Sequence, residues 1–403
     1  MKATTDAVTS SQYIIFRFIL ALYLLIHFTG LLPYSADIFA IDGMLGIIKN
    51  PPPHEYFPNL LNYWNSPTHV SLFLGALIAL SLSFALGFWP RSSALLLWYG
   101  WACLFNRNPL LATPGLPYIG WLLLICCACK NPRANPQNNS HWRLPAEAYW
   151  GGFSLMVIGY TISGVHKLSS PMWLEGKAVL NLIGDPISKP TFLANILVDL
   201  PWFLVSCLTY SVIAIELLFL PLCLIKALRL WAWLSALVIH IAILLTMGFI
   251  DLTASLIIIH LFTFDRRWIK PRHSADEAII FFDGLCTLCN HSVDLILQEG
   301  QEENTMLASL QGSTAYSRGI DQENLTSILV WRKDKKILTE SDAAIYIAET
   351  IGGLFGLITI CKIIPKPLRD IIYRLVAKHR YRIFGKEKTC RMPSPLEKKR
   401  FLP

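Results

Sequence analysis

Long apolar runs recur through the first 270 positions of this 403-residue chain, and they constrain its fold more than any other feature. A helix that crosses a bilayer needs about 20 mainly apolar residues, because the hydrocarbon core is about 30 Å thick. The runs that meet or approach this length lie at about 13–33, 69–89, 92–105, 116–129, 148–166, 203–225, 229–248 and 250–264. The sequence therefore predicts a multi-pass α-helical membrane domain of about eight helices over residues 1–272.

The composition agrees with a membrane location and excludes two other classes of protein. Apolar and aromatic residues make up 54% of the chain and charged residues only 15%, against about 25% charge in an ordinary soluble protein. A single soluble globule and a disordered chain are both excluded, since disordered chains are poor in large apolar residues. No nucleic-acid motif or nucleotide-binding glycine loop is found, so nucleic acid is not expected as a partner. The oligomeric state is left open.

The distribution of Lys and Arg predicts the orientation. If the N-terminus lies inside, 12 of the 17 basic residues up to Arg272 fall on the inner side, as the positive-inside rule requires. We therefore expect a multi-pass cell-membrane protein, which in a Gram-negative bacterium would mean the inner membrane, with the N-terminus and everything after Arg272 in the cytoplasm. Membrane lipid is an expected partner, because residues 361–403 hold 13 basic and 3 acidic residues and can lie on an anionic surface.

Several polar residues lie at membrane depth, where burial costs several kcal/mol unless they face a cavity or a partner. They are the segment 163–168 (SGVHKL) with 173–176 (WLEG), His240 in the seventh run, and 106–108 (NRN) after the third. A lysine half out of water has its charged form disfavoured, so Lys167 can act as a base. The alternatives are a lysine that snorkels to the interface and, for His240, a histidine hydrogen-bonded between helices.

The segment around Lys167 resembles the active-site segment of the vitamin K-dependent gamma-carboxylase superfamily, in particular its bacterial HTTM-domain relatives. The resemblance implies that Lys167 is the base that deprotonates a reduced quinone, with His166 in place of the first of two adjacent lysines. It also implies a quinone pocket near Lys167, His240, Asn106 and Asn108. The large outer domain that recruits a Glu-rich substrate has no counterpart here, so Glu carboxylation is not expected.

After Arg272 the pattern changes to the short alternating elements of a soluble domain. Strands are predicted at 278–282, at 306–310 and at 326–331, with a fourth ending near Thr339. One helix is predicted from the turn at 283–289 to about Gln298, and another after Ser341, with Ser341 and Asp342 as its N-cap. Strand, CxxC, helix, strand pair and helix is a thioredoxin-like order, so residues 273–403 are predicted to be an α/β thioredoxin-like domain.

Cys286 and Cys289 carry the chemistry expected of this domain. Two cysteines three apart at a helix start can close a small disulfide, and the helix dipole favours the thiolate of the first. Cys286 is predicted to attack and Cys289 to resolve. The alternatives are two buried thiols or half of a zinc site. A zinc site would need two more ligands at matching spacing, and Cys361 and Cys390 stand alone with His379 between them. No metal is therefore expected, and in a reducing cytoplasm the pair should cycle.

The domain also resembles the DCC-type thiol-disulfide oxidoreductase family along most of its length. The motifs appear in order as 282–290 (FDGLCTLCN), 341–344 (SDAA), 365–370 (PKPLRD), 373–374 (YR), 379–382 (HRYR), 384–385 (FG) and Cys390. The resemblance implies a thioredoxin-like fold and protein-disulfide reductase activity, with Cys286 and Cys289 as the redox pair. The partner would be a disulfide-containing protein or a small thiol.

The domain differs from thioredoxins in how it would hold a substrate. No proline occurs between Pro271 and Pro365, so the cis-proline that faces the CxxC in thioredoxins is missing. Asp283, Ser341 and Asp342 are predicted to position the substrate instead. For Ser341 and Asp342, simple helix capping is the alternative.

Three functions follow from these features. The first is a membrane-anchored thiol-disulfide oxidoreductase. The second is a quinone-linked, gamma-carboxylase-like enzyme with Lys167 as base and the tail as redox partner. The third is a non-enzymatic anchor or docking protein. The predicted topology places Lys167 and Cys286 on opposite sides of about 30 Å of hydrocarbon, so only a mobile carrier such as a quinone could couple them.

Overall fold

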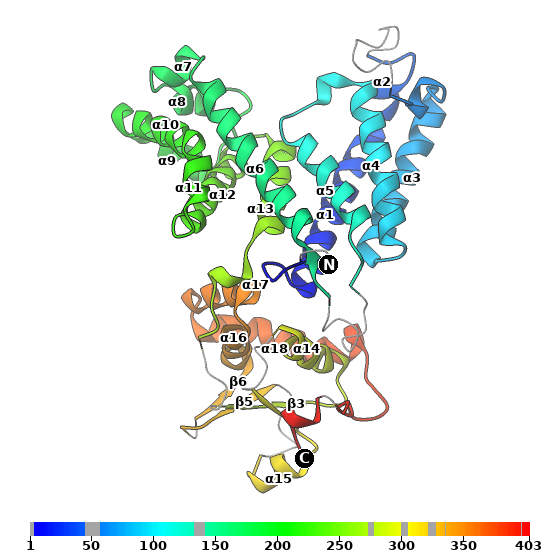
Figure 1. Cartoon of the computed structure of the whole chain (residues 1–403), viewed down its shortest axis with the longest axis vertical. Coiled ribbons are helices and arrows are strands. Elements are labelled where there is room, and N and C mark those ends of the chain that lie inside the picture. The colour runs from blue at the N-terminus through cyan, green and yellow to red at the C-terminus, as the bar shows by residue number, and fades with distance from the viewer. Residues whose placement is uncertain are drawn as a thin grey trace. The chain divides into compact units, whose positions relative to one another are not determined.

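The structure is a computed structural model that describes residues 4–44, 57–132, 142–272, 278–299, 305–320, 328–334, 336–395 and 397–403. The chain forms two compact units (Figure 1). The first is helical and ends at Phe264, while the second consists mainly of residues from Asp265 to the C-terminus and contains a mixed sheet.

Helices occupy most of the first unit, and each apolar run of the sequence contains at least one. The helices are α1 (Ser10–Leu31), α2 (Ser35–Phe39), α3 (Pro67–Leu86), α4 (Pro90–Arg107), α5 (Leu116–Ala128), α6 (Ala146–Lys167), α7 (Pro171–Leu174), α8 (Ala178–Gly184), α9 (Phe192–Asp199), α10 (Trp202–Leu217), α11 (Phe219–Leu224), α12 (Arg229–Thr246) and α13 (Ile250–Thr263). Short strands β1 (Thr4–Thr5) and β2 (Leu144–Pro145) pair antiparallel. Local signals set the ends of α3, where Ser66 caps the first turn and Gly87 takes a left-handed φ of 79°.

The prediction of about eight spanning helices is not supported. Among the described residues, three helical stretches are long and apolar enough to cross a membrane, at Ser10–Phe39, Pro67–Leu86 and Arg229–Thr246. A fourth counts only if α9 and α10, which meet at a bend of 115°, form one broken span.

The reason lies in the lengths and composition of the other helices. α5 and α13 have 13 and 14 residues, which at about 1.5 Å per residue reach only about 20 Å. The run at 203–225 breaks at Leu218 into α10 and a six-residue α11. α4 and α6 are long enough, but their Gly, Ser, Tyr and charged residues reduce their apolar character.

The sheet of the second unit has five strands in the order β6-β5-β3-β4-β7. They are β3 (Ala278–Phe282), β4 (Met306–Ser309), β5 (Leu329–Arg332), β6 (Ile337–Thr339) and β7 (Phe401–Leu402). β3 pairs parallel with β4 and antiparallel with β5, and β7 adds parallel to β4. The first four match the predicted strands, although 326 and 327 lie outside the described residues. The sequence pattern did not indicate β7, which has only two residues.

Alternating side chains of β3 divide the core between the two faces of the sheet. Ile280 and Phe282 pack in one apolar cluster with α14 (Thr287–Glu299) and α16 (Glu340–Ile351). Phe281 faces the other way, into a cluster that includes Ala315 of α15 (Ser313–Ser317). Figure 1 shows α14 and α16 on one side of the strands and α15 on the other. α17 (Gly353–Gly356) and α18 (Lys366–Phe384) follow α16.

The predicted start of α16 was wrong. The helix begins at Glu340, its N-cap residue is Thr339, and no side chain caps it. Ser341 therefore lies inside the first turn, and its hydroxyl is available for another partner.

Candidate dithiol active site

The CxxC lies where a tight turn enters α14. The backbone N–H of Leu285 donates to Asp283 Oδ1 at 3.1 Å, and the N–H of Cys286 donates to the Asp283 carbonyl at 3.1 Å. These two bonds close the turn so that Cys286 directly precedes the helix. Cys289 lies in the first helical turn, and its N–H donates to Cys286 Sγ at 3.4 Å. The first sulfur is thus an acceptor at a helix N-terminus, where negative charge is stabilised.

Both thiols are buried in the core of the domain. Cys286 is 0% exposed and Cys289 6%, within the apolar cluster that includes Val293 and Tyr346. Burial, together with the neighbouring Cys286 and the Asp283 carboxylate, raises the pKa of the Cys289 thiol to about 12. The Cys289 thiol is therefore protonated at neutral pH, as is expected of the cysteine that reacts second in a CxxC pair.

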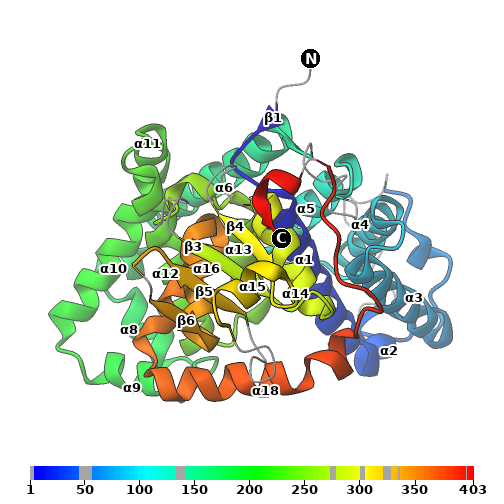
Figure 2. The ribbon, with the colours of Figure 1, turned by 90° about the horizontal axis from the view of Figure 1, so that it is seen from below.

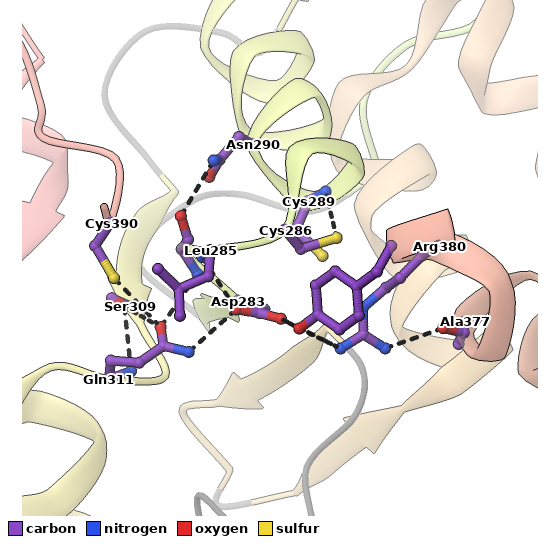
Figure 3. Close-up of polar contacts among 12 residues, drawn as sticks. Asp283, Leu285, Cys286, Cys289, Asn290, Ser309, Gln311, Ala377, Arg380 and Cys390 are labelled. Atoms are coloured by element: carbon purple, nitrogen blue, oxygen red, sulfur yellow. Dashed lines mark hydrogen bonds and ion pairs between the residues drawn. The ribbon is translucent and has the colours of Figure 1, made fainter. Parts of the chain in front are cut away.

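Asp283 is the centre of a polar network beside the sulfurs (Figure 3). Its carboxylate accepts hydrogen bonds from the Tyr381 hydroxyl, from Arg380 Nη2 at 3.2 Å and from Gln311 Nε2 at 3.1 Å. Burial alone would raise the pKa of Asp283, but these bonds and that of the Leu285 N–H hold the pKa below its usual value. The result is an ionised carboxylate in a nearly solvent-free ion pair, since the Asp283 and Arg380 side chains are 7% and 9% exposed.

A C-terminal strap, residues 386–391, covers the turn. Lys386 forms an antiparallel bridge with Cys286, the Glu387 N–H donates to the Leu285 carbonyl at 2.9 Å, and the Arg391 N–H donates to the Gly284 carbonyl at 3.3 Å. Gly284 packs closely against the strap, because a Cβ there would lie 2.9 Å from Cys390 Sγ and would displace that side chain. The strap lies against Cys286, which is 0% exposed, so we expect it to open before a substrate reaches the sulfur.

Weakening the strap is expected to expose Cys286. In the full chain, Glu387→Pro removes the N–H that binds the Leu285 carbonyl, while Glu387→Ala loses the same carboxylate and keeps that N–H. One backbone hydrogen bond contributes about 1 kcal/mol, so Glu387→Pro should raise the alkylation rate of Cys286 about five-fold above that of Glu387→Ala, measured by peptide mass spectrometry. Equal rates in the two variants would show that the strap does not limit access.

Ser341 and Asp342 bind α18. The Ser341 hydroxyl and N–H both donate to Asp370, and Asp342 pairs with Lys366 at 3.2 Å and Arg369 at 2.8 Å. Their observed role is to fix the start of the helix that carries Arg380. α16 contributes Ala343 and Tyr346 to the cluster around the cysteines. Substrate positioning by Ser341 and Asp342 stays a prediction.

In the helical unit, Lys167 forms an ion pair. Its ammonium donates to Glu216 Oε2 at 2.5 Å and to Ser163 Oγ at 2.8 Å, and it lies 4.9 Å from the centre of the Trp173 ring. α6 and α10 approach closely here, since a Cβ at Gly164 would lie 2.7 Å from the Leu217 nitrogen. Sequence reasoning missed Glu216 because no local pattern marks a partner 49 residues away.

The other residues predicted for a quinone pocket have contacts of their own. His240 is buried, with its ring centre 5.5 Å from that of Tyr160, and neither of its ring nitrogens has a hydrogen-bond partner among the described residues. Asn106 accepts from Asn59 at 2.8 Å, and Asn108 donates to the Ile38 carbonyl at 3.1 Å. His166 is exposed. A quinone pocket shared by Lys167, His240 and the two asparagines stays a prediction, and we assign no step to it.

Three residues of the dithiol network had no role assigned from the sequence. Arg380 and Tyr381 belong to the HRYR motif, which signalled a family but no partner, and Gln311 carries no motif at all. Within the part of the chain that the structure describes, no group of three or more His, Cys, Asp or Glu side chains could hold a metal ion.

Comparisons with known proteins converge on the second unit. A family model described as DCC1-like thiol-disulfide oxidoreductase matches residues 280–386. The uncharacterized protein YuxK of Bacillus subtilis (strain 168) is 37% identical over 129 residues, which are 31% of this chain and 93% of YuxK. The chloroplastic DCC family protein At1g52590 of Arabidopsis thaliana is 26% identical over 134 residues, covering 31% of this chain and 77% of that protein. No solved structure matches the chain.

Proposed function

The C-terminal domain of this chain belongs to the DCC1-like thiol-disulfide oxidoreductase family, and from this premise we propose a membrane-anchored thiol-disulfide oxidoreductase whose redox pair is Cys286 and Cys289. One observation carries the assignment of roles. The Cys289 N–H donates to Cys286 Sγ at 3.4 Å while the Cys289 thiol itself is held protonated by burial. Cys286 is therefore the nucleophile and Cys289 the resolving thiol.

The reaction proceeds in two exchanges. The Cys286 thiolate attacks one sulfur of a substrate disulfide, forms a mixed disulfide and expels the other substrate sulfur, which takes up a proton. Cys289 then loses its proton and attacks Cys286 Sγ, which forms the Cys286–Cys289 disulfide and releases the second substrate thiol. The substrate gains two electrons and the protein loses them, so a thiol or dithiol donor must reduce the pair again.

The helical unit supplies the anchor. Its three or four apolar helices are compatible with membrane association, and the orientation proposed here places the dithiol domain in the cytoplasm. The cytosol is reducing, which suits a dithiol that works as a reductase. The proposed location is thus the cell membrane, with the redox pair facing the cytoplasm.

A redox titration of the full chain in detergent tests this function. The protein is equilibrated against a glutathione series and alkylated, and the pairing of Cys286 with Cys289 is read by peptide mass spectrometry. We expect a reversible two-electron couple between about −270 and −180 mV, the span of known thiol exchangers. A Cys289→Ser chain should show no such couple. Thiols that stay unpaired across the whole series would contradict the proposal and favour the docking function.

A further inference from the structure

α18 has two faces of different character. Its inward face carries Asp370 and Arg380, which are 6% and 8% exposed and bind Ser341 and Asp283. Its outward face carries apolar side chains, among which Ile372 is 61% and Leu375 60% exposed. Figure 2 shows α18 as one long continuous helix.

Most of the exposed apolar residues of α18 follow the helical repeat and form one stripe. These are Leu368, Ile371, Ile372, Leu375, Val376 and Ile383, while the exposed Tyr381 and Phe384 lie elsewhere on the helix. Positions spaced by three and four residues lie on one side of a helix. The helix of a soluble domain normally turns such a stripe toward the core, whereas α18 turns it away from the domain. A contiguous exposed apolar stripe of this kind marks a binding surface.

The charges beside the stripe decide what it binds. α18 contains six Lys and Arg residues and a single acidic residue, Asp370, which is buried. Arg374, Lys378 and Arg382 are exposed on the helix. A second copy of the chain would bring like charges together, which disfavours a symmetric pair. An apolar stripe flanked by cations is the pattern of a helix that lies on an anionic lipid surface.

We propose that α18 lies in the plane of an anionic membrane surface, with its apolar stripe in the boundary between headgroups and acyl chains. The chain itself has helices that can cross a membrane, so the second unit is tethered within reach of lipid. Long side chains such as Lys378 and Arg382 can extend from the stripe to the phosphates. The opposite face of the same helix holds Asp283 beside the cysteines, so this contact would place the dithiol at the bilayer surface. The lipid contact does not depend on the dithiol chemistry.

Photo-crosslinking of the full chain in vesicles tests the lipid contact. The crosslinking residue p-benzoylphenylalanine replaces Leu375 in one variant and Tyr316 in another, since Tyr316 is an 82% exposed side chain of α15. Vesicles contain either phosphatidylcholine alone or a mixture with about a third phosphatidylglycerol. We expect lipid adducts from position 375, at least about five times more than from position 316, and more in the anionic vesicles.

Charge variants complete the test. Lys378→Gln with Arg382→Gln should reduce the lipid adducts at position 375 about ten-fold, while the matched change Lys333→Gln with Lys336→Gln, in the exposed turn before β6, should leave them unchanged. Adducts from position 375 to this chain, to a second copy or to another protein, in place of lipid, would overturn the proposal. Equal lipid adducts from positions 375 and 316 would overturn it too, because they would reflect general proximity to the bilayer. Redox activity is not part of the readout.

Discussion

Replacing Cys286 with serine is expected to abolish disulfide reduction by the full chain, while replacing Cys289 with serine should stop the reaction halfway. Cys286→Ser removes the sulfur that attacks the substrate, and loss of a nucleophile costs about a thousand-fold or more in rate. Cys289→Ser leaves that sulfur in place but removes the thiol that would release the substrate. A mixed disulfide between Cys286 and the substrate should then accumulate.

The two variants are distinguished by their products. Reduction of a disulfide-linked model peptide follows turnover, and mass spectrometry under non-reducing conditions detects the adduct on Cys286. Cys361→Ser is the matched control, because Cys361 is an exposed cysteine of the same domain and should keep full turnover. Turnover lost in Cys390→Ser but kept in Cys289→Ser would assign the resolving role to Cys390, whose sulfur lies beside Gly284.

The sequence was sufficient to predict the elements around the CxxC. β3, α14, β4 and β6 follow from apolar alternation and from the turn at 283–289 that leads into a helix, which are local signals. No local sequence signal predicts strand β7 or the strap. β7 has two residues, and the strap is held by backbone bonds from Glu387 and Arg391 to Leu285 and Gly284, about a hundred positions away.

The hydrogen-bond partners of Asp283 and Ser341 could not be predicted from local sequence signals either. Asp283 was a candidate from its place in the motif, but its partners Arg380 and Gln311 come from α18 and from the loop after β4. Ser341 looked like a helix cap because a serine before an apolar run commonly is one. The backbone began the helix two residues earlier, and the hydroxyl bound Asp370 instead. The residue types indicated which interactions these side chains could make. Which side chains pair with one another could be seen only in the folded chain.

The count of spanning helices failed for a different reason. Hydropathy identifies segments that avoid water, and the helices found in the apolar runs agree with that. It does not decide whether a run forms one straight helix, and α10 and α11 divide one run at Leu218 while α9 and α10 meet at 115°. Short or bent helices can remain in a membrane when they pack against neighbouring helices.

The second large effect is expected from breaking the ion pair of Asp283 and Arg380. Asp283→Asn leaves the Arg380 guanidinium buried without its counter-charge, and removing one member of a buried pair costs about 3–5 kcal/mol. Arg380→Gln should cost less, because the Asp283 carboxylate keeps the hydrogen bonds of Tyr381, Gln311 and the Leu285 N–H. The double variant should be more stable than the sum of the two losses predicts, since neither charge is then left alone.

The pH dependence of the stability distinguishes the electrostatic contribution of this ion pair from the contribution of side-chain packing. The pKa of Asp283 lies below its usual value in the folded chain, so the contribution of its carboxylate is complete above the unfolded pKa of about 4. It is lost as the pH falls through the lower folded pKa. Hydrogen exchange of α14 and α18, followed by mass spectrometry from pH 7 downward, should therefore show a difference between wild type and Asp283→Asn that shrinks only below about pH 4. A difference that stays constant down to pH 3, or a double variant as unstable as the sum of the single losses, would show that the pair acts through shape alone.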